Sequence, residues 1–185
     1  MTQDTHIVEE FANFVAEFKD ESDRAIVVLT AARLDLLLMS VLQKHLRPSP
    51  AKTDDFFENQ GPGATLSGKI MLANRLGLID DDFARALNLV RRIRNDFAHE
   101  TSACSLEQGG HLHRVRALAA PYQKHPFYPW FGKKFFHSDP PGRTNFMTSV
   151  GILILRLEFL LSKLDTIDYS KATPVIPKSE WPIKK

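Results

Sequence analysis

The feature that most constrains this chain is a stretch, residues 25–42, that is apolar on nearly every side of a helix. Arg33 and Asp35 lie in its middle, and charges at that depth are costly in a bilayer. A second apolar stretch, residues 150–164, is too short to span the hydrocarbon core and also carries an arginine and a glutamate. Both patterns predict central helices of a soluble bundle, with no part of the chain in a membrane.

The rest of the chain shows the periodicity of shorter helices. Apolar residues recur every three or four positions, and capping residues, glycines and prolines mark the ends. The pattern predicts helices over residues 7–19, 23–46, 66–76, 80–99, 111–119 and 146–164. We therefore expect an all-α bundle of five to six helices. It forms a single domain, residues 1–165, followed by a loosely ordered tail, residues 166–185, that is rich in proline and lysine.

Charge and cysteine content limit the classes of function. A formal net charge of +2 over 185 residues is too small to attract nucleic acid in bulk, so any basic site must come from local clustering. The single cysteine, Cys104, excludes an internal disulfide framework and fits a reducing compartment. The first ten residues show no secretory pattern. Together these features predict a cytoplasmic protein.

One long segment, residues 121–143, is aromatic and basic and lacks a clear helical pattern. Because Pro129 interrupts it, we expect an irregular loop or a short hairpin with a turn at Gly132. Its aromatic residues can cover the bundle core or a dimer interface, which we favour because aromatics bury more often than they display. Alternatively they stack on bases while Lys133 and Lys134 hold phosphates.

A phosphate-binding loop is suggested by the spacing from Gly63 to Lys69. The next residue, Ile70, lacks the hydroxyl that Mg²⁺ chemistry needs, and no strand pattern precedes the loop. A structural role is the better interpretation, with glycines in an unusual turn and Thr65 or Ser67 capping the next helix. The residues of this structural motif are Gly61, Gly63, Ser67 and Lys69.

The most informative placement is that of Arg94, near the end of the helix over residues 80–99. It follows Val90 by four positions, so an ideal helix puts its guanidinium inside the apolar stripe. A cation there must extend to water or meet an anionic partner. Asn95 and His99 are four apart and share a face, while His99 lies ~140° around the helix from Arg94.

These three side chains suit cleavage of RNA without a metal. His99 would act as general acid and base, Arg94 would stabilise the charge on the phosphate oxygens, and Asn95 would orient the phosphate. A structural interpretation stays open beside this one. In it, Arg94 pairs with a buried acid such as Asp35, and His99 caps the C-terminus of its helix.

The segment Arg94-Asn95-x-x-x-His99 resembles the arginine–histidine motif of the HEPN superfamily. That resemblance implies a helical bundle, usually dimeric, and in many members a metal-independent endoribonuclease with a polar residue after the arginine. Separately, the order of features over residues 22–165 is similar to the mannitol operon repressor family. The blocks that carry this likeness are Phe56-Phe57, Gly61-Pro62-Gly63, Leu66-Ser67-Gly68-Lys69-Ile70, Leu76-Gly77-Leu78-Ile79 and Ile93-Arg94-Asn95-Asp96-Phe97-Ala98-His99.

The second resemblance implies a bacterial regulator of a sugar-alcohol transport operon, built on a helical fold without a DNA-reading module. The sequence agrees, since we find no helix-turn-helix signature and no helix with a row of arginine, lysine and amide residues for the major groove. We therefore expect a homodimer that regulates through a protein or RNA partner rather than by reading DNA directly. Expected RNA contacts are Arg91, Arg92, Lys133 and Lys134.

The alternatives are a metal-independent endoribonuclease and a non-catalytic interaction module. A zinc site on His99, Cys104, His111 and His113 is a weaker alternative, because its spacing matches no standard finger. We expect no metal and no cofactor.

Overall fold

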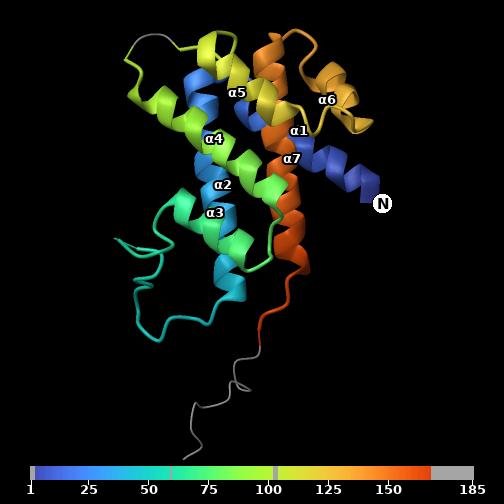
Figure 1. The fold of residues 1–185 in the computed structure, drawn as a ribbon. Helices are drawn as coiled ribbons and strands as arrows, with labels where there is room; N and C mark the ends of the chain where they lie inside the picture. The colour runs from blue at the N-terminus through green and yellow to red at the C-terminus, as the bar shows by residue number, and fades with distance from the viewer. Residues whose placement is uncertain (1–2, 59, 102–103, 168–185) are drawn as a thin grey trace, which may run out of the picture.

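The computed structural model describes residues 3–58, 60–101 and 104–167, with side chains from residue 9 onward. These residues form seven α-helices and no strand, so the fold is all-α (Figure 1). The helices are α1 (Gln3–Phe18), α2 (Asp23–His45), α3 (Leu66–Arg75), α4 (Asp81–His99), α5 (Gly109–Ala119), α6 (Phe127–Phe135) and α7 (Pro141–Lys163). The expected tail lies outside the described residues from position 168 onward.

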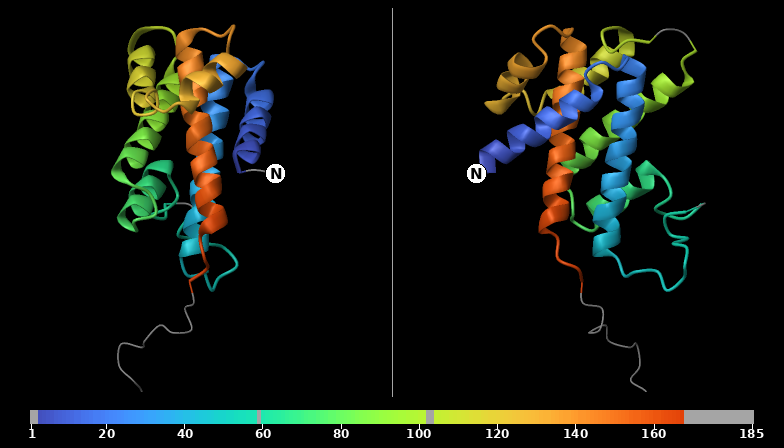
Figure 2. Two further views of the ribbon diagram at one scale, coloured as in Figure 1. Left: turned by 90° about the vertical axis from the view of Figure 1, so that its right-hand side faces the viewer. Right: turned by 180° about the vertical axis from the view of Figure 1, so that it is seen from behind.

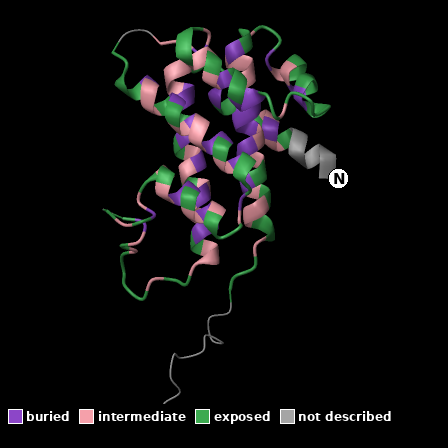
Figure 3. Ribbon diagram, in the orientation of Figure 1, coloured by how far each residue is buried: buried purple, intermediate pink, exposed green. Residues whose placement is uncertain are grey.

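The two long apolar helices, α2 and α7, run side by side in the same direction (Figure 2). Arg143 at the start of α7 bonds Asp23 at the start of α2, and Lys44 near the end of α2 donates to the Leu161 carbonyl. The other helices pack around this pair, and buried residues are densest where α2, α4 and α7 meet (Figure 3). The prediction that both apolar stretches form central helices is confirmed.

The local signals for helix ends also hold. The hydroxyl of Ser22 accepts from the amide of Ala25 at the start of α2, and the carboxylate of Asp80 accepts from Phe83 at the start of α4. Gly77 follows α3 with φ of 71° and ends it, because glycine enters the left-handed region without strain. These caps fix where α3 stops and α4 begins, and so set the position of the α4 side chains.

The expectation of a loop or hairpin over residues 121–143 is wrong, because α6 occupies its centre. Pro129 is the third residue of α6, and the first turn of a helix needs no amide donor from it. The last helix also starts earlier than expected, at Pro141. The described chain therefore has seven helices where five or six were expected.

The aromatic residues of this segment divide into two groups. Tyr128, Phe131 and Phe136 are buried, and the ring of Phe131 stacks on Phe11 of α1 with 4.2 Å between centroids. The favoured interpretation, that the aromatics cover the core, is confirmed for these three. Phe127 and Trp130 remain exposed.

By length and composition alone, α2 and α7 are long and apolar enough to cross a membrane. The central helices of a bundle pass the same test, and roughly half of each helix is buried inside this one. Arg33 of α2 bonds both Glu17 of α1 and Glu158 of α7, so these central charges are paired within the fold.

Candidate nucleic-acid interface

Arg94 does not lie inside the apolar stripe of α4, as expected, but is exposed. The neighbouring stripe residues Val90, Ile93 and Phe97 are fully buried. The difference follows from helix lengths, since α3 has 10 residues and α4 has 19. Figure 1 shows α3 beside the first part of α4 only, so the side of α4 that α3 covers at its start is open to solvent near its end.

The guanidinium of Arg94 bonds its neighbour, donating to Asn95 Oδ1 over 3.2 Å. The proposed pairing with Asp35 is wrong, because Asp35 accepts two bonds from Lys69, with Nζ–O distances of 2.8 and 2.9 Å. Lys69 is only 3% exposed, so its ammonium is committed to holding α3 against α2. Arg94 is therefore open to an external anion, and Lys69 is not.

The loop that resembles a phosphate site is a packing device. The Thr65 hydroxyl accepts from the amide of Gly68 and caps α3, whereas Ser67 is exposed and makes no cap. A Cβ on Gly68 would lie 2.1 Å from the Pro62 carbonyl oxygen, and one on Gly61 would lie 2.2 Å from that of Asp55. The expected cap by Thr65 is confirmed. Close backbone approach, rather than a positive φ, accounts for the glycines at positions 61 and 68.

His99 is the last residue of α4 and is exposed, with no hydrogen bond or ion pair in the described part of the chain. The capping role proposed for it belongs to Arg24 of α2. Arg24 donates to the carbonyl of Phe97 over 2.6 Å and to that of Glu100 over 2.8 Å. Because another cation satisfies the helix end, the imidazole of His99 is left facing solvent.

The outward side of α4 carries a row of basic and amide side chains that sequence reasoning missed. Positions spaced by three or four residues share this side, and the members of the row are Arg85, Asn88, Arg92, Asn95 and His99. The two arginines and the histidine are exposed. We call this set the outer row. The expectation that no helix offers such a row is therefore wrong, although counting outward positions of α4 would have found it.

A half-buried arginine and a surface hollow lie next to the outer row. Arg91, half-buried, donates through Nε to Asn88 Oδ1 over 3.2 Å. Four of the neighbouring side chains, Arg85, Asn88, Leu89 and Arg92, line an open hollow on the helix surface. Arg92 makes no hydrogen bond or ion pair among the described residues. At this depression the guanidinium of Arg92 is free, whereas that of Arg85 is paired with Asp82.

Asp82 pairs with Arg85 at the beginning of the outer row, over 2.6 Å, whereas the acids at the other end of α4 face away from the row. Asp96 accepts from Arg114 of α5 over 2.5 Å, and its Oδ2 lies 4.0 Å from Nδ1 of His111. Nε2 of His111 lies 2.9 Å from the Glu100 carboxylate, and its ring is 4.6 Å from that of Phe97. Both carboxylates are therefore paired on the α5 side, and they do not neutralise the outer row.

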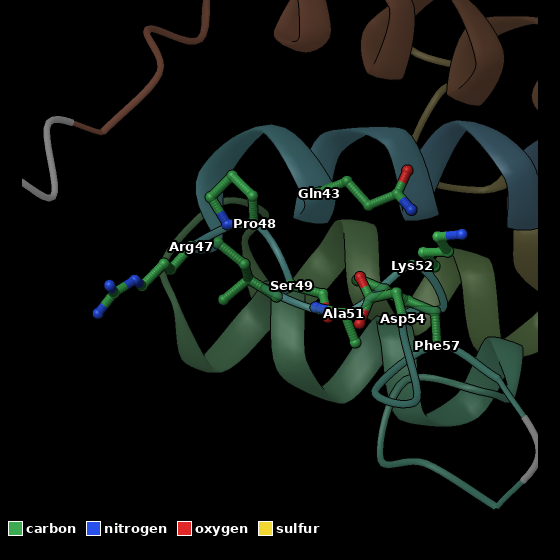
Figure 4. A pocket seen from close by; sticks show the side chains of 9 residues that line it. Gln43, Arg47, Pro48, Ser49, Ala51, Lys52, Asp54 and Phe57 are labelled. Carbon is green, nitrogen blue, oxygen red and sulfur yellow. Dashed lines mark hydrogen bonds between the residues drawn. The ribbon is translucent and has the colours of Figure 1, made fainter.

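Another hollow lies at the end of α2 and is lined by nine residues between Gln43 and Phe57 (Figure 4). Lys52 and Asp54 face it, whereas the side chain of Arg47 extends away from it. No histidine or cysteine lines it. Its lining therefore lacks an imidazole or a thiol, and it includes no residue of the outer row.

The zinc alternative has no support in the geometry. Among the described residues, no group of three or more histidine, cysteine or acidic side chains could hold a metal ion. Cys104 is a half-buried free thiol.

Comparison with known proteins adds no further constraint. No family model, no curated protein and no solved structure matches this chain. The class of protein that the fold and the site define is therefore an all-α bundle with an exposed basic row on one helix.

Proposed function

We propose that this chain is a regulatory protein that binds RNA through the outer row of α4. The observation that carries the proposal is the exposure of Arg92 and His99 with no carboxylate partner. Arg94, beside the row, is also exposed and bonds Asn95 of the row. Arginine is suited to phosphate because its planar donors match the oxygens, and the two amides of the row add hydrogen bonds to sugar and base.

The local charge supports this choice of ligand. Helices α4 and α5 contain six arginines and three aspartates. Each aspartate is engaged: Asp81 by Asn74, Asp82 by Arg85, and Asp96 by Arg114. The chain as a whole has a formal charge of only +2, so these two helices concentrate the positive charge. A phosphate backbone would be drawn to that concentration.

Regulation of the mannitol operon repressor type, implied by the sequence resemblance, is compatible with such a surface. The regulator would act on a transcript, and direct reading of an operator is not required. A protein partner is the other route that the resemblance implies. The outer row favours RNA over an acidic protein surface, since its alternating arginines and amides suit phosphate and base edges together.

Metal-independent cleavage of RNA is a second candidate, favoured by the position of His99. On its helix side, Asn95 lies one turn away and Arg92 two turns away. Arg94 is ~140° around the helix. We therefore propose Arg92 and Asn95 as the phosphate-binding partners of His99 within one chain, with His99 as acid and base.

We also propose that the protein is a homodimer that pairs through α2. The outward side of α2 carries no charged residue between positions 25 and 43; it presents Ala25, Val28, Leu29, Ala32, Leu36, Met39 and Gln43. Leu29 is 45% exposed and Leu36 is 58% exposed. Exposed apolar patches of this kind mark interfaces. Ala32 is central, so a two-fold axis there would let two copies of α2 approach closely, with Leu29 of each against Leu36 of the other.

Binding to RNA is tested with a labelled, mixed-sequence single strand and the variants Arg92→Ala and Arg94→Ala. Each should weaken binding several-fold, and each should reduce the slope of log affinity against log salt by about 0.7 per lost phosphate contact. The matched control is Arg47→Ala, which removes the same charge from the exposed end of α2. Equal affinity of all variants with the unaltered chain would falsify the proposal.

Cleavage is tested separately, by incubating the same RNA with the protein in EDTA. Loss of cleavage in His99→Ala, with binding retained, supports the enzyme. Absence of cleavage by the unaltered chain removes the second candidate and leaves the RNA-binding proposal standing.

A further inference from the structure

Helix α6 exposes two aromatic rings one turn apart. Phe127 is 50% exposed and Trp130 is 41% exposed, whereas Tyr128 and Phe131 of the same helix are buried against the bundle. The buried pair anchors α6, so the exposed pair is not needed to hold the helix in place. Phe127 stacks on the ring of His125, with 5.4 Å between centroids, and the exposed parts of the two rings, here called the aromatic pair, are open to an external ligand.

The aromatic pair lies in a basic and acid-free part of the chain. Residues 121–138 contain Lys124, Lys133 and Lys134 and no aspartate or glutamate. All three lysines are exposed, and Nζ of Lys134 lies 4.6 Å from the centroid of the Trp130 ring. The next acid along the chain, Asp139, is already within 3.6 Å of Arg143 Nε. Rings beside unpaired ammonium groups complement a ligand that is both flat and anionic.

We infer that the aromatic pair of α6 stacks unpaired bases of the RNA, which makes the ligand single-stranded rather than duplex. This inference rests on the proposed function, because it extends the RNA site from α4 to α6. Bases in a duplex hide their faces in the helical stack, so only an unpaired segment offers them to Phe127 and Trp130. Lys133 and Lys134 hold the adjoining phosphates.

The order of the helices would let one RNA strand contact both the outer row of α4 and the aromatic pair of α6. The chain runs from α4 through α5 to α6, and α5 lies between the other two (Figure 1). Arg116 of α5 and Lys124, in the turn before α6, are both exposed. A strand held by the outer row meets these cations before it reaches the aromatic pair.

A lipid surface is the competing ligand for exposed aromatics beside lysines. Interfacial helices insert a broad apolar face, and their affinity scales with the apolar area that they bury. The apolar face of α6 is already used, since Tyr128, Phe131 and Phe136 pack into the bundle. Two exposed rings, one of which has a lysine ammonium over its face, therefore favour base stacking over insertion into a lipid surface.

The experiment compares a single-stranded RNA with the same strand annealed to its complement. In the unaltered chain the single strand should bind more tightly. Trp130→Ala and Phe127→Ala should each weaken binding of the single strand at least about fivefold and leave duplex binding nearly unchanged. The matched control is Phe159→Ala, which removes an exposed ring from α7. In a Trp181→Phe background, Trp130 is the only indole, and the single strand should quench its fluorescence.

The outcomes separate this inference from the proposed function. If Arg92→Ala weakens binding and neither aromatic variant does, the stacking site is overturned and the RNA-binding function stands. If the unaltered chain binds no RNA, both are overturned. Anionic phosphatidylserine vesicles form a third arm; vesicle binding lost in Trp130→Ala, with RNA binding unchanged, assigns the aromatic pair to a membrane surface and overturns the inference.

Discussion

Nζ of Lys69 lies 2.8 Å from Oδ1 of Asp35, and the two partners differ in burial. The Lys69 side chain is almost fully buried, whereas that of Asp35 keeps about a third of its exposure. Removal of either partner breaks the same bond between α3 and α2. The consequences differ, because the group left behind is in one case a buried cation and in the other a carboxylate that water can reach.

Asp35→Ala should therefore destabilise the protein more than Lys69→Met. We expect about 3 kcal/mol for the first variant and about 1 kcal/mol for the second, since methionine fills the space of the lysine stem. Urea unfolding at neutral pH measures both, with Lys52→Ala as the exposed control. A larger loss in Lys69→Met would mean that the charge of Asp35, rather than that of Lys69, is the costly one.

Gly68→Ala should be strongly destabilising. The new Cβ would meet the Pro62 carbonyl oxygen at 2.1 Å, so the turn before α3 would have to open. The expected cost is about 2 kcal/mol or more, in the range of backbone displacement in a packed region. Gly110→Ala is the matched control because its nearest neighbour is the tip of the Arg114 side chain, at 3.3 Å. Similar thermal unfolding of both variants would contradict the packing role of Gly68.

Stability should fall at high pH because of Tyr128. Burial raises the pKa of Tyr128 to about 12, and its hydroxyl lies 3.1 Å from the Asn145 carbonyl oxygen. A folded-state pKa above the unfolded value of about 10 means that the stabilisation is complete below pH 10 and is lost as pH rises toward 12. The loss should approach about 2–3 kcal/mol.

Tyr128→Phe checks this assignment. The variant should be about 1 kcal/mol less stable at pH 7, where it lacks the hydrogen bond, and should lose less stability than the unaltered chain between pH 10 and 12. Denaturant titrations at pH 8, 10 and 11.5 provide the comparison. Parallel curves for the two proteins would show that another group governs the alkaline loss.

Leu36→Glu should abolish the proposed dimer. A carboxylate on the central apolar side of α2 would have to be desolvated in the pairing of two copies, whereas the fold of one copy would tolerate it at an exposed position. Light scattering after gel filtration should show a dimer for the unaltered chain and a monomer for the variant. Met71→Glu places the same charge on an exposed residue of α3 and should leave the dimer intact. A monomeric unaltered chain would remove this part of the proposal.

The sequence was sufficient for most of the helices because their periodicity and caps are local. Ser22, Thr65 and Asp80 each mark a helix start through a bond to an amide only three residues away. The sequence pattern does not predict α6, because Pro129 interrupts the segment, although a proline in the first turn of a helix is tolerated.

Sequence patterns point to α4 as the helix of the candidate site, but they do not give the arrangement of its side chains. Whether Arg94 is buried depends on how far α3 extends along α4, which is a tertiary property that helical spacing does not encode. Likewise, nothing local to His99 shows that Arg24, 75 positions earlier in the chain, satisfies the end of its helix. The outer row follows from helical spacing alone, but the pairing of Asp96 with Arg114 of α5 does not.

Helix α2 is apolar on two opposite sides, so hydrophobicity alone cannot choose which side turns inward. A rotation by half a turn would bury Leu29 and Leu36 in place of Leu34 and Leu38 at little cost in apolar area. Such a rotation would separate Arg33 from its two glutamates and Asp35 from its lysine. These polar contacts therefore determine which of the two apolar sides of α2 faces the core.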